Sequence, residues 1–447
     1  MQALTLQANI ASKWVNIALI QFPDEEQLNI TELEYFGEYV QEHFGVDDYH
    51  AATLNYPVNM FVDRDGPGWM RFLDDIIPSG ASRRFWVSYL GIGDKSKAEQ
   101  DFELLKHGTT APVGNLRILE SLPPEDPDPH AMARTFRVEE VKERATDFLE
   151  YAQRLGAAAG GATGAGGEAP KLLLRCTNNG NVWIDSYQDD PTNLDSFYLV
   201  KYPRNERRDI DCDVLRAEYH FYHELEAMGF EAIQTQGMRL IEGDRYPSLW
   251  LPRFDVVTVD GQVERLGLES VYSILQKQPG DFLDHKQTLV TLVEAISQSH
   301  MVTVQGFKFD AEAFVIEWVQ RDLLNIAFGN SDNHGRNTSF LKGKGWIELA
   351  PIYDFAPMKA DPEDVTRTIT WGAGLEIGGE FNFAQIAAEL AELADSSKLL
   401  TELKTTAGKL VGLKQRLADR GVPNTILDLP SIGFDYLDEK LTRWNLL

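Results

Sequence analysis

The chain has 447 residues, 43% of them hydrophobic, 11% aromatic and 25% charged, a composition typical of globular proteins that excludes collagenous, coiled-coil and disordered classes. With 42 Lys and Arg against 69 Asp and Glu, the formal net charge is -27, which disfavours direct binding of nucleic acid or an anionic membrane. Cys176 and Cys212 are the only cysteines, which excludes a disulfide framework and a four-thiolate zinc site, and no stretch of about 18 apolar residues occurs, so we expect a soluble cytoplasmic protein.

Residues 1–125 predict a compact α+β unit. Short apolar stretches such as Trp14–Phe22 and Phe85–Leu90 are separated by turn-rich polar stretches, and Ala98–Lys106 predicts a short helix. The segment Ser121–His130 contains four prolines and three acids in ten residues, a composition that favours a connection over the interior of a helix or strand. We therefore expect a domain boundary there.

The next segment combines a predicted helix with a glycine-rich stretch. From Arg137 to Leu155 apolar residues recur mostly at three- and four-residue steps, which predicts an amphipathic helix that stops at Gly156. Gly156–Pro170 follows and is rich in Gly and Ala. Taken alone, such a segment is equally consistent with a flexible linker and with a loop that has a function.

A small antiparallel sheet is predicted directly after the glycines. Asn179 and Gly180 are typical of a two-residue hairpin turn. A helix over residues 213–228 and a strand in LWLPRFDVV (residues 249–257) come next, and helical periodicity prevails from about residue 265 onward. The three expected strands are Lys171–Arg175, Asn181–Ile184 and Phe197–Val200, and the later helices include Leu289–Ser297, Phe314–Phe328 and Phe383–Leu393.

Polar residues are unusually dense in GNSDNHGRNTSF (Gly329–Phe340), which lies between an apolar helix and an apolar strand-like stretch. Asp332 and Asn337 are five residues apart, so one carboxylate can face a substrate hydroxyl while a carboxamide oxygen takes a metal ion. Asp354 follows 17 residues after Asn337 and can hold Mg²⁺ that bridges phosphates. Each residue alone is explained more simply as a capping or turn residue. His334, in the same loop, is more typical of a hydrogen-bonded organiser than of a metal ligand.

A lysine and an acid complete this set. Lys201, in FYLVKYP, ends a predicted strand, a position from which lysines usually reach solvent. Glu218, on the helix that follows, can orient its ammonium as the Lys–Glu pair of protein kinases does; the alternative for Glu218 is an exposed helix acid. Together with the glycine-rich loop and the sheet, these residues form the set that phosphoryl transfer requires.

Six segments resemble, in the same order, the motifs of the HipA-type serine/threonine kinases of bacterial toxin-antitoxin systems. The stretches GWMRFLDDIIPSGASRRFWVSYLGI and DFELLKHGTTAPVGNLRIL are similar to the extra N-terminal subdomain of that family, so the resemblance covers nearly the whole chain. The six segments are TGAGGEAPK (Thr163–Lys171), FYLVKYP, RAEYHFYHELEAMGFEA, LPRFDVV, GNSDNHGRNTSF and APIYDFAP.

The resemblance implies an α+β, two-lobed protein-kinase-like fold with an extra N-terminal α+β subdomain. The expected parts are a HipA-type N-terminal subdomain (1–125), a small β-rich kinase N-lobe with the glycine-rich loop (131–257) and a mainly helical C-lobe with the catalytic and metal-binding loops (258–447). Arg253–Asp255 match a family motif just after the strand that leads into the adenine-binding hinge.

The resemblance also implies roles for single residues. Asp332 takes the position of the catalytic base, and Asn337 and Asp354 take the metal positions. The family often has Ser where this chain has Thr163, which makes Thr163 the candidate for self-phosphorylation of the loop. The residues expected to bind ATP are Gly164, Gly166, Gly167, Lys201, which is also expected to act in catalysis, and Glu218.

We therefore expect an ATP- and Mg²⁺-dependent protein serine/threonine kinase of HipA type, a toxin that phosphorylates a cytoplasmic protein. Its expected partners are this protein substrate and a small helix-turn-helix antitoxin. Because the chain is acidic, any link to DNA is expected to run through a basic partner. Two alternatives stay open: a catalytically silent kinase-fold binding module that acts with a DNA-binding antitoxin, and a small-molecule kinase on the same scaffold.

Overall fold

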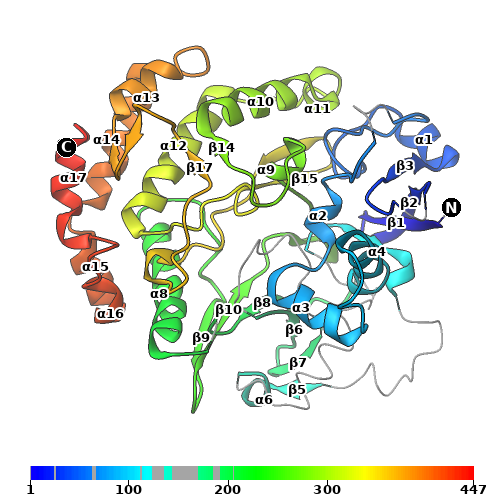
Figure 1. Cartoon of the computed structure of the whole chain (residues 1–447), viewed down its shortest axis with the longest axis horizontal. Helices are drawn as coiled ribbons and strands as arrows, with labels where there is room; N and C mark the ends of the chain where they lie inside the picture. The colour runs from blue at the N-terminus through cyan, green and yellow to red at the C-terminus, as the bar shows by residue number, and fades with distance from the viewer. Residues whose placement is uncertain are drawn as a thin grey trace.

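The computed structural model describes residues 2–24, 27–62, 67–110, 113–122, 135–142, 170–184, 192–204 and 206–447. The chain begins with a four-stranded sheet of order β3-β2-β1-β4, in which every neighbouring pair is antiparallel. In Figure 1 this sheet lies at one end of the molecule and the C-terminal helices lie at the other. Its strands are β1 (Gln2–Ile10), β2 (Lys13–Phe22), β3 (Glu32–Tyr35) and β4 (Leu116–Ile118), and the accompanying helices are α1 (Gly37–His43), α2 (Leu73–Ile76), α3 (Gly80–Tyr89), α4 (Lys97–Gly108) and η1 (Leu119–Ser121).

This N-terminal segment, residues 2–122, has a hydrophobic core of its own. Alternate residues of β1 and β2 point into it, and Phe22 meets Phe102 of α4 edge to face with ring centroids 4.8 Å apart. The predicted short helix Ala98–Lys106 is confirmed as α4, whose first turn is closed by a capping box between Ser96 and Glu99.

A second, six-stranded sheet has the order β5-β7-β6-β8-β10-β9. The three strands predicted after the glycines are confirmed within it, and β6 pairs with β8 so that Lys171 lies opposite Lys201. The predicted helix over residues 213–228 is present as α8 but begins earlier, because the Asp211 carboxylate accepts a hydrogen bond from the backbone N–H of Arg208. The elements are β5 (Phe136–Arg137), α6 (Val138–Lys142), β6 (Lys171–Cys176), β7 (Asn181–Ile184), β8 (Ser196–Lys201), α8 (Asp209–Ala227), β9 (Arg239–Glu242) and β10 (Pro247–Pro252).

Residues from Val256 onward are mainly helical and supply most of the largest core, which also includes buried residues of α8 and of the second sheet. A three-stranded sheet, β13-β15-β16, packs beside the central helix α12. The elements up to β17 are β11 (Val256–Val259), β12 (Gln262–Arg265), β13 (Gly267–Ser270), α9 (Val271–Ile274), β14 (Leu283–Asp284), α10 (His285–Gln298), α11 (His300–Thr303), α12 (Ala311–Phe328), β15 (Ser339–Gly343), β16 (Trp346–Leu349), η3 (Met358–Ala360) and β17 (Ile369–Thr370). They are followed by β18 (Glu376–Ile377), β19 (Glu380–Phe381), α13 (Phe383–Glu389), α14 (Ser396–Leu410), α15 (Leu413–Arg420), α16 (Asn424–Leu427), η4 (Phe434–Tyr436) and α17 (Leu437–Arg443).

Three sequence predictions need correction or completion. The strand predicted over residues 249–257 is two strands, because β10 ends at Pro252 and a buried pair between Arg253 and Asp255 turns the chain before β11. The helix predicted over Phe383–Leu393 ends at Glu389, where the backbone N–H of Leu390 closes the last turn on Ile386. Of the helix predicted over 137–155, the described residues show α6, and 143–155 lie outside them.

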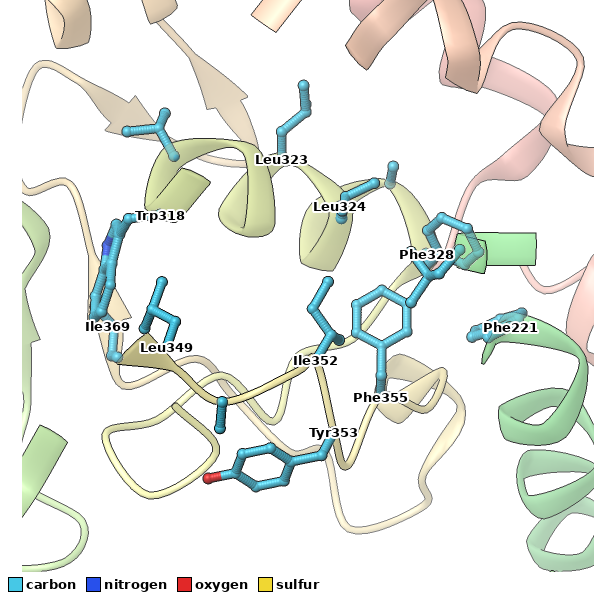
Figure 2. Packing of buried hydrophobic residues seen from close by; sticks show 14 of the residues in the cluster. Phe221, Trp318, Leu323, Leu324, Phe328, Leu349, Ile352, Tyr353, Phe355 and Ile369 are labelled. Carbon is cyan, nitrogen blue, oxygen red and sulfur yellow. The ribbon is translucent and has the colours of Figure 1, made fainter. Parts of the chain in front are cut away.

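Buried aromatic and aliphatic side chains hold the segment around residue 354 in place. Figure 2 shows side chains of α12, among them Leu324 and Phe328, facing Ile352 and Phe355. Phe355 also lies within 5.2 Å of Phe328, centroid to centroid, with the rings tilted toward an edge-to-face arrangement. Since Tyr353 and Phe355 are both buried, the residue between them is fixed with little freedom.

The N-terminal segment is joined to the rest of the chain through buried carboxylates. Glu269 accepts hydrogen bonds from the hydroxyl of Thr53, the backbone N–H of Leu54 at 2.9 Å and the ammonium of Lys342 at 2.8 Å. Asp75 of α2 accepts a hydrogen bond from the backbone N–H of Ser270 at 2.8 Å. Such contacts are costly to break, because a buried charged group is left without its partner.

Glu269→Gln should lower the free energy of unfolding by about 3 kcal/mol, since the amide leaves Lys342 buried without its counter-charge. Urea denaturation measures the loss. The matched control is Glu389→Gln, which removes an exposed pair with Lys286 and should change the midpoint little. Equal shifts for both variants would contradict a structural role of Glu269 at this junction.

Candidate functional site

Lys201 is the centre of a buried cluster of charges. The side chain of Lys201 is 5% exposed, and its ammonium lies 2.5 Å from the Oε1 of Glu218 and also contacts Asp354. The ammonium of Lys171 contacts the other oxygen of Asp354 at 3.0 Å. The simple alternatives, a lysine that reaches solvent and an exposed helix acid, are therefore wrong for Lys201 and Glu218.

The two lysines keep Asp354 ionised. Burial opposes ionisation, but Lys171 and Lys201 outweigh it and hold the pKa of the Asp354 carboxyl well below its usual range. Burial lowers the pKa of Lys171, whereas for Lys201 the attraction of Asp354 and Glu218 overcomes burial and raises the pKa. The site thus holds fixed charges of both signs away from bulk water.

Backbone and hydroxyl contacts tie this cluster to α8. Asp354 has a φ of 52°, in the left-handed region that costs energy for residues other than glycine. The next residue, Phe355, donates its backbone N–H to the hydroxyl of Tyr222, which donates to the Oε1 of Glu218 at 3.0 Å. This chain of hydrogen bonds couples the strained Asp354 position to the acid that holds Lys201.

Asp332 lies in the polar loop that follows α12, where Gly329 ends the helix in the left-handed conformation. The Nδ1 of His334 accepts the backbone N–H groups of Arg336 and Asn337, each at 3.2 Å. The ring proton of neutral His334 is therefore assigned to Nε2, which lies 3.3 Å from the Oδ1 of Asp332. His334 thus organises the loop and orients the Asp332 carboxylate.

Asn337 offers an oxygen for a hard cation. Its amide nitrogen donates to the backbone carbonyl of Asp332 at 2.8 Å, and its buried Oδ1 has no hydrogen-bond partner among the residues that the structure describes. An orphaned buried oxygen is costly unless something binds it. Asn337 and the carboxylate of Asp354 are the kind of oxygen ligands that Mg²⁺ prefers alongside phosphate and water, so the residues present fit the metal.

Asn337 lines a small cavity with Asp332 and Tyr353, whereas Asp354 lines two others. One is lined by Lys171, Lys201, Glu218, Asp332 and Asp354, so it brings together the expected base, the lysine and one expected metal ligand. The other is mainly apolar and begins beside Lys201 and Asp354. Its walls include Val113, Leu199, Ile233, Leu251 and the segment Pro252–Asp255.

Not every predicted site residue lies within the described parts. Thr163, Gly164, Gly166 and Gly167 lie outside them, so their expected roles stay predictions. Lys171 was missed, although it ends the quoted TGAGGEAPK motif. The signal for it is the strand register, because Lys171 lies directly opposite Lys201 in the β6–β8 pair and shares its face of the sheet.

Asp322, on α12, was also missed, and it holds the polar loop Gly329–Phe340 and the segment around Arg367 through hydrogen bonds. Its Oδ1 accepts hydrogen bonds from Asn333 at 3.3 Å and Arg367 at 2.7 Å, and its Oδ2 accepts one from Trp371 at 2.8 Å. Burial opposes ionisation of this carboxyl, but Arg367 and His285 together lower its pKa well below the usual range. Asp322 is the only acid in the apolar second half of α12, Trp318–Phe328, and this is the sequence signal that marks it.

Asp322→Asn should cost about 3 kcal/mol of stability at pH 7, because Arg367 loses the more deeply buried of its two carboxylate partners and keeps only Glu376, at 3.0 Å. The folded-state pKa of Asp322 is depressed, so its contribution is complete above the unfolded pKa near 3.9 and is lost as pH falls below it. Guanidinium denaturation of both proteins at pH 7 and pH 3 should show the difference shrinking in acid. A difference that stays constant would rule out the charge as the cause.

The geometry can be compared with known proteins. The family model HipA_C, the HipA-like C-terminal domain, matches residues 163–412. HipA of Shewanella oneidensis MR-1, solved with HipB and operator DNA, superposes with a TM-score of 0.65 at 16% identity over 99% of this chain and 97% of that chain. The Helicobacter pylori proinflammatory kinase CtkA gives a TM-score of 0.36 at 14% identity over 63% of this chain and 90% of that chain.

The comparisons set the family and the fold. No curated protein sequence matches the chain. Within the described ranges, the helices are all too short or too polar to cross a membrane. The likeness to the Shewanella protein over nearly both full lengths shows a shared overall fold. Since the HipA-like model covers more than half of the chain, this protein belongs to the HipA-like C-terminal domain family, as the sequence motifs predicted.

Proposed function

We propose that the protein is an ATP- and Mg²⁺-dependent serine/threonine kinase of HipA type with a two-lobed kinase-like fold. The observation that carries the proposal is the single cavity in which Lys201, held by Glu218 and Asp354, lies together with Asp332. Protein kinases use such a Lys–Glu pair with a metal-binding Asp and a catalytic Asp to transfer the γ-phosphoryl group. Membership of the HipA-like family supports the same activity.

In this proposal Asp332 accepts the proton of a substrate serine or threonine hydroxyl, while the hydroxyl oxygen forms a bond to the γ-phosphorus and ADP leaves. The Nε2–H of His334 keeps the receiving oxygen of Asp332 oriented. Lys201 and Lys171 offset the negative charge of the phosphates. Magnesium, when bound at Asn337 and Asp354, supplies further charge neutralisation.

The nucleotide is proposed to bind with its adenine in the apolar cavity between Val113, Leu199 and Leu251. Gly164, Gly166 and Gly167 are proposed to offer backbone N–H groups to the phosphates. Thr163 is proposed as a site of self-phosphorylation. A phosphate on Thr163 would compete with ATP for the same backbone donors, so the modification is expected to inhibit the enzyme.

We further propose that the protein is a toxin that phosphorylates a cytoplasmic protein. Its proposed partner is a small helix-turn-helix antitoxin. The Shewanella HipA was solved together with HipB and operator DNA, which supports an antitoxin partner for this chain. The net charge of -27 favours contact with DNA through a basic partner, whose association would be salt-sensitive.

The test is transfer from radiolabelled ATP to a bacterial lysate, with phosphosites identified by mass spectrometry. The Asp332→Asn protein serves as the blank. Serine or threonine sites that depend on Asp332 and Mg²⁺ are expected. Label found only in small metabolites would favour the small-molecule kinase, and no label above the blank would favour the silent binding module.

A further inference from the structure

A large cavity lies between the N-terminal segment and the mainly helical part, and Asp332 lies in its wall. Its volume is about 510 Å³, within the range of about 300–1,000 Å³ typical of ligand sites. One side comes from α2, α3, α4 and their connections, and the other includes His334 and Arg336 of the polar loop. It is separate from the cavity that holds Lys201 and Asp354, although Asp332 and Arg204 line both.

The walls of this cavity carry a small excess of cations in a chain that is strongly acidic overall. The cations are Arg71, Arg83, Lys97, Arg204 and Arg336, and the acids are Asp74, Asp101, Asp332 and Glu363. Arg83 and Lys97 both contact Asp101, each at 2.5 Å, so two positive charges share one carboxylate. Arg204 lies 3.1 Å from Asp361 and 3.6 Å from the half-exposed Glu363, and Arg71 lies 3.4 Å from Asp74. Since the chain carries -27, cations gathered beside the expected catalytic base point to recognition of a negative group.

Arg336 is the least neutralised of these cations. It is 3% exposed, donates to the backbone carbonyl of Asp74 at 2.6 Å, and forms no ion pair with a carboxylate in the described parts of the chain. Its neighbours Asp74 and Asp75 compensate only in part, because burial raises the pKa of both carboxyls, that of Asp75 to about 7. The Nε of Arg336 and the Nε of Arg204, which is 8% exposed, have no hydrogen-bond partner in the same parts.

The N-terminus of α3 adds a second positive feature to the cavity. Ser79 and Gly80, where this ten-residue helix begins, line the wall. The first turn of α3 contains no acidic residue, and the side chain of Ser79 does not cap it. The backbone N–H groups of a first helical turn and the helix dipole favour a negative group at such a place.

We propose that this cavity binds an acidic side chain of the protein substrate, next to the serine or threonine that is phosphorylated, and that Arg336 and Arg204 recognise it. The inference rests on the proposed function, since it places the acceptor hydroxyl at Asp332. It deepens that function by making the N-terminal segment one wall of the substrate site. The phosphates of ATP are assigned to Lys201 and Lys171, in the other cavity.

The test uses peptides with a central Ser in an Ala background and one Glu placed in turn at three positions on each side. Each peptide has a Gln version of the same shape. At one position or more, the Glu peptide should be phosphorylated with a kcat/KM about tenfold or more above the Gln peptide, as expected for a charge-assisted hydrogen bond. Arg336→Met and Arg204→Met should each reduce this ratio toward one.

A control variant and a binding assay separate this inference from the kinase proposal. Lys414→Met removes one positive charge from α15, outside the cavity, and should keep the Glu preference. Fluorescence anisotropy of labelled Glu and Gln peptides measures the same preference without transfer. If the protein binds Glu peptides more tightly than Gln peptides but transfers no phosphate, the kinase proposal is wrong and the assignment of the cavity to an acidic side chain stands. Transfer with equal use of both peptides, or equal loss in Lys414→Met, would overturn the assignment.

Discussion

Asp332→Asn should reduce γ-phosphate transfer by about 10²–10⁴-fold while the affinity for ATP changes less than about threefold. The amide keeps the shape of the side chain and can still accept the hydrogen bond from the Nε2 of His334, but it cannot take a proton. The phosphates of ATP are expected to contact Lys201 and Lys171, which form no ion pair with Asp332 in the described structure. Binding and transfer should therefore separate.

Radiolabel transfer and calorimetric titration with ATP measure the two quantities on the same preparation. Asp435→Asn is the matched control. Asp435 is an exposed acid that pairs with Lys414, and it lies about 100 residues after Asp332 in the sequence. That variant should behave as wild type in both assays. Transfer by Asp332→Asn within about tenfold of wild type would remove Asp332 from the role of base.

The parts of the site that the sequence predicts are those with a local signal. Strand periodicity places Lys201 at the end of β8, and helical spacing places Glu218 on α8, so their meeting follows from two adjacent elements. Lys171 has no such signal, because its role depends on the β6–β8 register that sets it opposite Lys201. Register is decided by packing of the whole sheet.

Long-range packing also explains what the sequence leaves open. Pro252 ends β10, and Arg253 and Asp255 become a buried pair because Asp255 also accepts the backbone N–H of Gly114 at 2.7 Å. The large cavity beside Asp332 likewise forms between segments about 200 residues apart, which are joined by contacts such as that of Asp75 with Ser270. No periodicity or motif in one segment indicates which distant segment it packs against. The expected domain limits therefore stay predictions.

Lys201→Met should lower the free energy of unfolding by about 3 kcal/mol and weaken ATP binding about tenfold or more. Removing the ammonium leaves Glu218, which is 3% exposed, as a buried charge without its ion-pair partner. Asp354 keeps Lys171, so the damage is expected at Glu218 in particular.

The double variant Lys201→Met/Glu218→Gln distinguishes the two effects. Neutralising Glu218 removes the unpaired buried charge, and the amide introduced there can still accept the hydrogen bond of Tyr222, so the double variant should regain at least half of the lost stability. ATP binding should stay weak, because the ammonium that is proposed to contact the phosphates is still missing. Urea denaturation and calorimetric titration with ATP measure the pair of outcomes. Recovery of both stability and ATP affinity would mean that Lys201 serves only to neutralise Glu218. Recovery of stability without recovery of ATP affinity is the result expected if Lys201 binds phosphate. In that case Glu218 and Asp354 position the ammonium of Lys201, and the ammonium contacts the phosphates of ATP.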